Sequence, residues 1–261
     1  MSSTQFVQLR HARTAFRVCG EGPPLLLIHG AEATGSSFDA LARTLSKSMT
    51  VIAYDQRECG ETQAVEPATQ LPELVDDAAE LIDALGLGKP TVLGTSFGGR
   101  LAQGLAILYP QKVDRLVLCN TWPLDAALEA INPPGVARLV ELRSGLPDTA
   151  RRLAQAYYGP DYVAAHPELV DRFARGSGMG SSRAGLIRQV HRLLPERIDA
   201  PTLLLSGSRD EVVPPHIMQG LHQKIRSSQL VEIEEAHHAI TVEWPGKVAR
   251  EIEAFVKGTP R

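Results

Sequence analysis

Short, unbroken runs of apolar residues recur along this chain of 261 residues. The clearest runs occupy residues 25–28, 50–54, 91–93, 115–119 and 202–205, and a weaker one lies at 229–233. A run of this length without polar alternation predicts a strand covered on both faces, as in the centre of a parallel sheet. Between several runs the apolar residues recur at helical spacing, as at 74–85, 98–109 and 248–256. The pattern therefore predicts an α/β fold with a mainly parallel, doubly wound sheet.

Two parts of the chain depart from this rhythm. Residues 5–19 alternate apolar and polar side chains around a short break, which predicts a half-exposed β-hairpin. Between residues 120 and 200 no strand is predicted over about 80 residues, far more than a crossover needs. The stretches 128–146, 150–158 and 167–174 look helical instead. We interpret residues 122–199 as a helical cap inserted into a core formed by residues 1–121 and 200–261.

The composition excludes several classes of function. The chain has 27 basic and 30 acidic residues, a formal net charge of −3, so no nucleic-acid surface is expected. No apolar run can span a bilayer, and the first 20 residues lack the apolar stretch of a signal peptide. A cytoplasmic protein that binds no membrane is therefore expected. The three cysteines form neither a disulfide framework nor a CxxC pair, so no metal site is predicted. Nothing in the sequence indicates the oligomeric state.

Residues 94–98, Gly-Thr-Ser-Phe-Gly, match the pattern G-x-S-x-G. They follow a predicted strand and open a predicted helix, so Ser96 would lie on a tight turn that exposes its hydroxyl. Glycines are needed there because neighbouring backbone crowds such a turn. The start of the helix would direct free N–H groups toward a developing oxyanion. Ser96 is therefore the candidate nucleophile, and the alternative is a capping serine in a glycine-rich connection.

A serine nucleophile needs a base and a carboxylate that orients the base. His237 and His238 follow the last predicted strand. Adjacent residues in an extended stretch point in opposite directions, so only one of the two can reach the site. Asp210 lies just after the strand at 202–205, at the edge where sites form in open α/β sheets. It is the candidate carboxylate.

Serine, aspartate and histidine in this order resemble the triad of the α/β-hydrolase family, serine-nucleophile branch, and the resemblance covers about residues 20–258. Further matching features are His29-Gly30 after an early strand, the turn at 55–62, and a histidine followed by Glu243 and Pro245. The departures from the family pattern are Glu58, Thr62 and His237. The histidine of the family motif corresponds to His238. The resemblance thus implies a triad of Ser96, Asp210 and His238.

The resemblance also implies a sheet of about eight strands with an inserted helical cap. The oxyanion hole would be formed by the backbone N–H groups of Ala31 and Phe97. Small bacterial esterases and enol-lactonases are the similar enzymes, which implies a cofactor-independent serine hydrolase of a small, mostly apolar ester or lactone. The reaction would pass through an acyl-enzyme on Ser96. The alternatives are a carbon–carbon bond hydrolase of a ring-cleavage product and a non-catalytic small-molecule receptor on the same fold.

We expect the cap to determine which substrate is bound. The candidate substrate-binding residues are aromatic or apolar: Trp122, Tyr157, Tyr158 and Met179. The cap is also rich in arginine, and one of these arginines is a candidate partner for a substrate carboxylate. His29 is expected to brace its loop, and Arg57 either braces its turn or faces the substrate. The sequence assigns no role to Arg100.

Overall fold

The structure, a computed structural model, describes residues 3–176 and 181–258. Within these residues a nine-stranded sheet has the order β1-β2-β4-β3-β6-β7-β8-β9, and β5 pairs with β2. The strands are β1 Gln5–Gln8, β2 Ala12–Cys19, β3 Pro24–Ile28, β4 Thr50–Tyr54, β5 Gln63–Ala64, β6 Thr91–Thr95, β7 Arg115–Cys119, β8 Thr202–Gly207 and β9 Ser228–Ile233. Strands β4, β3, β6, β7, β8 and β9 are parallel, whereas β1, β4 and β5 are antiparallel to β2. The predicted mainly parallel sheet and the hairpin are therefore confirmed.

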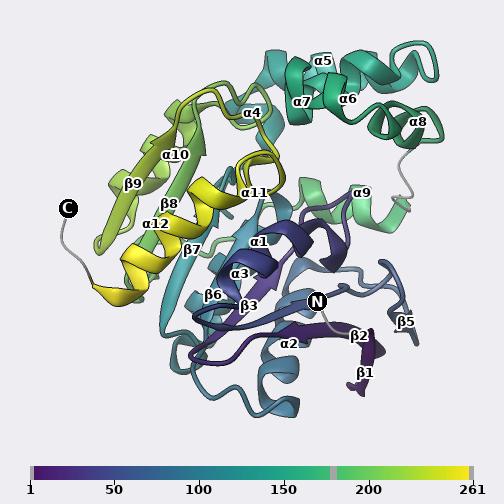
Figure 1. Ribbon diagram of the computed structural model, residues 1–261. Coiled ribbons are helices and arrows are strands. Elements are labelled where there is room, and N and C mark those ends of the chain that lie inside the picture. Colours follow the sequence, from purple (N-terminus) through teal and green to yellow (C-terminus); the bar gives the residue numbers. More distant parts are fainter. Residues whose placement is uncertain (1–2, 177–180, 259–261) are drawn as a thin grey trace.

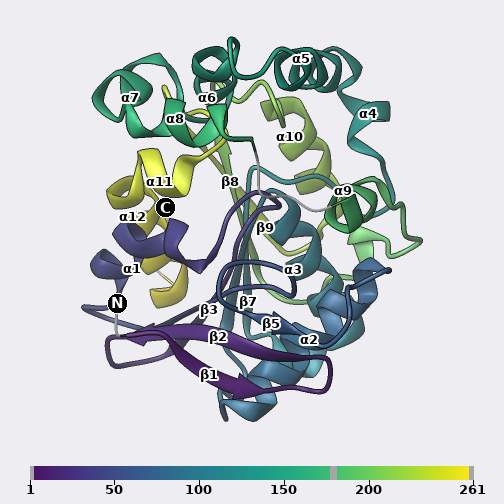
Figure 2. The same ribbon diagram turned by 90° about the vertical axis from the view of Figure 1, so that its right-hand side faces the viewer.

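The central strands β3, β4, β6, β7 and β8 are buried on both faces, as the unbroken apolar runs predict. In β3, Leu25 and Leu27 face one hydrophobic cluster, whereas Leu26 and Ile28 face another. The first cluster is covered by α1 (Asp39–Leu45), α11 (Ile240–Glu243) and α12 (Pro245–Lys257). The second is covered by α2 (Leu71–Ala84), α3 (Phe97–Leu108) and α10 (Pro215–Lys224). Figure 2 shows α1 and α12 on one side of the strands and α2 and α3 on the other.

Within the described residues, six α-helices lie between β7 and β8, and we call them the inserted helices. They are α4 Leu128–Ile131, α5 Pro133–Ser144, α6 Ala150–Tyr158, α7 Pro160–Ala165, α8 Glu168–Ala174 and α9 Ser181–Arg188. Helices α5 to α8 are grouped beyond one end of the sheet (Figures 1 and 2). The sequence did not predict helix α7, because Gly159-Pro160 is typical of a connection between helices. Instead Pro160 begins a helix, a position where its missing N–H costs nothing.

Among the helices within the described residues, none is long and apolar enough to cross a membrane.

Candidate active site

Ser96 lies on a strained turn between β6 and α3. Its backbone has φ +52° and ψ −123°, outside the regions that most residues adopt. The two glycines of the motif are required by close packing: a Cβ on Gly94 would lie 2.3 Å from the carbonyl oxygen of Gly98. A Cβ on Gly98 would lie 2.2 Å from the carbonyl oxygen of Ile28. The turn therefore holds the Ser96 hydroxyl at the carboxyl end of the sheet.

The structure brings Ser96, His238 and Asp210 into one hydrogen-bonded chain. The Nε2 atom of His238 lies 2.9 Å from Ser96 Oγ, and its Nδ1 atom lies 2.8 Å from Asp210 Oδ2. The other carboxylate oxygen of Asp210 accepts N–H groups of Val212 and Val213 at 2.8 and 2.9 Å. An ionised carboxylate can only accept hydrogen bonds, so Nδ1 carries the histidine proton and Nε2 is free to accept from the serine.

His237, the neighbour of His238, contacts Glu243. Its backbone N–H donates to Glu243 Oε2 at 2.9 Å, and its Nδ1 atom lies 3.3 Å from Glu243 Oε1. Burial raises the pKa of Glu243 to about 8 and lowers the pKa of His237. Burial therefore favours the neutral form of both side chains. The contact between His237 and Glu243 stabilises the loop that carries His238 and does not involve Ser96.

A cavity of about 440 Å³ opens above Ser96 and His238. Its walls include Trp122, Tyr157 and Tyr158, three of the four residues predicted to bind substrate. The fourth, Met179, lies outside the described residues. Further apolar wall residues come from the inserted helices, among them Leu139 and Phe173.

The sequence matches the family model for the alpha/beta hydrolase fold over residues 23–243. The chain belongs to this family. It is 29% identical over 213 residues to 3-oxoadipate enol-lactonase 2 of Acinetobacter baylyi, which covers 79% of this chain and 78% of the relative. It is 26% identical over 258 residues to a putative carbamate hydrolase, RutD, of Pseudomonas syringae, and the match covers 94% of this chain and 98% of the relative. A solved esterase from Thermogutta terrifontis is 26% identical with a TM-score of 0.79, covering 97% of this chain and 98% of that structure.

In this α/β hydrolase, Ala31 and Phe97 both line the cavity beside Ser96. Phe97 directly follows Ser96 and is the first residue of α3. The loop at Gly30 lies against the serine, since a Cβ on Gly30 would be 3.4 Å from Ser96 Cβ. His29 braces this loop: its Nε2 atom accepts the Gln56 N–H at 3.1 Å, and its carbonyl accepts from Gln56 Nε2 at 2.6 Å.

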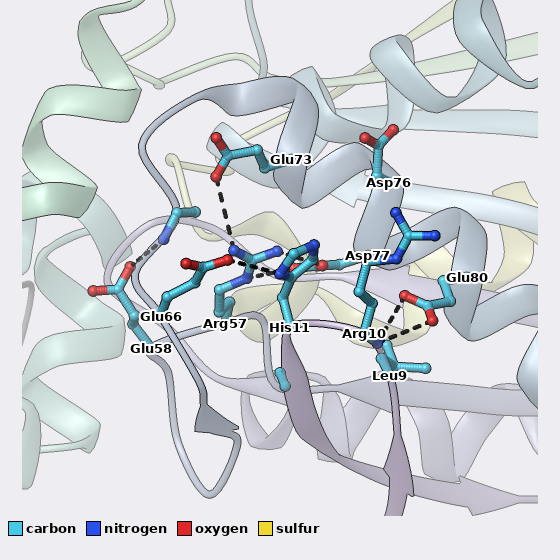
Figure 3. Close-up of polar contacts among 12 residues, drawn as sticks. Leu9, Arg10, His11, Arg57, Glu58, Glu66, Glu73, Asp76, Asp77 and Glu80 are labelled. Carbon is cyan, nitrogen blue, oxygen red and sulfur yellow. Dashed lines mark hydrogen bonds and ion pairs between the residues drawn. The ribbon is translucent and has the colours of Figure 1, made fainter.

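Arg57 lies outside the cavity walls and braces its turn against α2. Its guanidinium donates to both oxygens of Asp77 at 2.9 and 2.6 Å, and Arg57 is 3% exposed. Glu73, one turn earlier on α2, lies 3.7 Å from the same guanidinium. Figure 3 shows Arg57 enclosed by these carboxylates and by His11, which pairs with Glu66. The interpretation as a bracing residue fits this geometry better than contact with the substrate.

Arg100, to which the sequence assigned no role, ties the inserted helices to α3. It is fully buried and donates to the carbonyl oxygens of Leu124, Ile187 and Gln189 at 2.7 to 3.1 Å. Burial lowers its pKa to about 10. One side chain thus holds both the first and the last parts of the segment that crosses over the cavity.

Asn120, at the end of β7, was missed at the sequence level. Its Nδ2 atom donates to the carbonyl oxygens of His237 and His238 at 2.9 and 2.8 Å, and its Oδ1 atom accepts the Gly207 N–H at 2.8 Å. Asn120 is fully buried and has φ +43°. The only signal for it was its place directly after a predicted strand. Asn120 holds the His238 loop to the strand that precedes Asp210.

Among the described residues, no group of three or more histidine, cysteine or acidic side chains could hold a metal ion.

Proposed function

We propose that this α/β hydrolase is a cofactor-independent serine hydrolase that cleaves a carboxylic ester or lactone of a small, mostly apolar molecule. The observation that carries the proposal is the chain of hydrogen bonds from Ser96 through His238 to Asp210, with the serine facing the cavity. A serine hydroxyl is a weak nucleophile unless an adjacent base takes its proton. The proposal is supported by the position of His238 Nε2, 2.9 Å from Ser96 Oγ and within reach of the hydroxyl proton.

In the first step Ser96 Oγ attacks the carbonyl carbon of the substrate while His238 Nε2 takes the hydroxyl proton. Asp210 stabilises the imidazolium that forms. The negative charge on the carbonyl oxygen is stabilised by the N–H groups of Ala31 and Phe97. The tetrahedral intermediate collapses, His238 gives the proton to the leaving alkoxide, and an acyl-enzyme on Ser96 remains. Water, deprotonated by His238, then attacks the acyl carbon. The bond to Ser96 Oγ breaks, His238 returns the proton to this oxygen, and the acid is released.

We assign residues 122–199 the role of a cap that shapes the substrate pocket. Tyr157 supports this role because its ring lies edge-on to the ring of His238, with centroids 5.6 Å apart. Trp122 and Tyr158 line the same cavity and are the other proposed contacts of the substrate. The relatives named above are a lactonase, a putative carbamate hydrolase and an esterase, names that describe cleavage at a carbonyl carbon.

The test is hydrolysis of p-nitrophenyl butyrate by the purified protein and by Ser96→Ala, His238→Ala and His237→Gln. We expect Ser96→Ala and His238→Ala to lose at least about a thousandfold in kcat, because triad residues act as a unit. His237→Gln is the matched control and is expected to retain activity within about fivefold, since its side chain contacts Glu243 rather than Ser96. Full activity of Ser96→Ala would contradict the mechanism.

A lactone panel and a dienol ring-cleavage product, assayed in parallel, distinguish the alternatives. Turnover of the dienol alone would indicate a carbon–carbon bond hydrolase. Tight binding of a small molecule without turnover of any ester or lactone would indicate a receptor.

A further inference from the structure

The walls of the cavity carry an excess of positive charge. Six charged side chains line it, four arginines and two glutamates: Arg143, Arg172, Arg175, Arg188, Glu32 and Glu129. Arg143 is paired with Glu32 at 2.8 Å, and Arg188 is paired with Glu129 at 3.3 Å. Within the part of the chain that the structure describes, Arg172 and Arg175 have no carboxylate within 4.0 Å. Among the described residues, these two positive charges on the cavity wall therefore have no carboxylate partner.

Arg172 lies close to the proposed reaction centre. From α8 its Nη2 atom donates at 2.7 Å to the carbonyl oxygen of Glu32, the residue after Ala31 in the proposed oxyanion loop. The next residue, Phe173, stacks on Tyr157 with ring centroids 5.6 Å apart. Tyr157 in turn contacts the ring of His238. The guanidinium is thus beside the loop and the aromatic wall that enclose Ser96.

The known contacts of Arg172 are with neutral groups. One is the carbonyl oxygen of Glu32. The other is the hydroxyl of Tyr158, and burial raises the pKa of this hydroxyl more than the nearby guanidinium lowers it. Arg143 differs, because its Nη2 atom donates to both the Glu32 carboxylate and the Tyr157 hydroxyl. A substrate anion would compete with Glu32 for Arg143 but would meet no such competitor at Arg172.

We propose that the substrate carries a carboxylate, which Arg172 binds with the support of Arg175, three residues further along. This inference rests on the proposed function and narrows it to esters or lactones with an apolar body and an acidic end. A guanidinium matches a carboxylate because its N–H donors form a planar fork. Arg172 is exposed at the cavity, so solvent screens the interaction, and we expect an effect of about tenfold.

The test compares two esters of the same acyl chain, monomethyl adipate and dimethyl adipate, by titration of the acid released at about pH 7.5. At this pH the free carboxyl of the monoester is ionised. We expect the protein to prefer the monoester in kcat/KM by about tenfold, and this preference to shrink when NaCl is raised from about 0.05 to 0.5 M. Arg172→Gln should abolish the preference, and Arg172→Lys should restore part of it. Arg151→Gln removes an exposed arginine of α6 outside the cavity wall and should keep the preference.

A merely structural role of Arg172 would predict equal losses for both esters in Arg172→Gln, with an unchanged ratio, and that result would overturn the proposal. Preference for the diester by the unaltered protein would overturn it as well.

Binding is measured separately by calorimetry on Ser96→Ala, with and without Arg172→Gln. The monoester should bind about tenfold more tightly than the diester only when Arg172 is present, and the absence of tighter monoester binding refutes the carboxylate site. Ester hydrolysis that survives in Ser96→Ala would instead refute the proposed mechanism and leave the binding result to decide the carboxylate.

Discussion

Replacing Asn120 by alanine tests whether the His238 loop is held by one side chain. The substitution removes three hydrogen bonds and leaves the Gly207 N–H and the carbonyl oxygens of His237 and His238 without this partner. Each buried polar group left unsatisfied costs about 1–3 kcal/mol. Partial relaxation reduces the sum, so we expect a loss of about 3 kcal/mol in the free energy of unfolding.

The same substitution should impair catalysis. The backbone of His238 would lose its link to β7, and the imidazole would no longer be held 2.9 Å from Ser96 Oγ. A displacement of about 1 Å at a reacting group can cost about a hundredfold in rate. We expect kcat to fall by about this factor, with a smaller change in KM.

The assays are urea denaturation followed by tryptophan fluorescence, and steady-state hydrolysis of p-nitrophenyl butyrate. Asn120→Gly is the matched control for backbone conformation, because glycine adopts the observed φ of +43° without strain. Asn120→Gly should lose almost as much stability and activity as Asn120→Ala if the hydrogen bonds dominate. A loss below about 1 kcal/mol together with kcat within threefold of the unaltered protein would refute the reasoning.

Three further substitutions test other parts of the site. Gly98→Ala places a Cβ 2.2 Å from the Ile28 carbonyl oxygen and should lower the melting temperature by roughly 5 °C or more and abolish ester hydrolysis. Glu243 has a pKa raised by burial to about 8, so the stability that its neutral form contributes is lost as pH rises from about 4.5 to about 8. Glu243→Gln should therefore gain roughly 3–4 kcal/mol in the free energy of unfolding, relative to the unaltered protein, as pH rises from 5 to 8 in urea denaturation. Arg100→Met removes the donors to three backbone carbonyls and should make residues 122–189 more susceptible to limited proteolysis.

The controls for these substitutions are also in the chain. Gly220→Ala in α10 meets nothing within 4 Å and should raise rather than lower the melting temperature. An unchanged melting temperature in Gly98→Ala would show that the turn can relax. A stability difference between Glu243→Gln and the unaltered protein that is independent of pH would contradict the raised pKa. Unaltered proteolysis of Arg100→Met would show that other contacts hold the inserted helices.

The strands and the nucleophile turn could be predicted because they depend on local pattern. An apolar run such as 202–205 is buried on both faces wherever the chain places it, and this requirement is visible in the residues themselves. The Gly-Thr-Ser-Phe-Gly turn could be predicted for a similar reason. Its glycines are required by close packing within the turn and against the adjoining β3. The choice of His238 over His237 depended on the spacing to Glu243 and Pro245 that resembles the family.

The contacts between distant segments were decided only by the tertiary structure. Asn120 reaches His238 across 118 positions of the chain, and Arg172 reaches Glu32 across 140. An arginine in a helical stretch looks the same in sequence whether it faces water, as Arg151 does, or a cavity, as Arg172 does. The physical reason is that hydrogen bonds and charge balance depend on which side chains the packing brings within about 3–4 Å, and local periodicity says only which face of an element is buried.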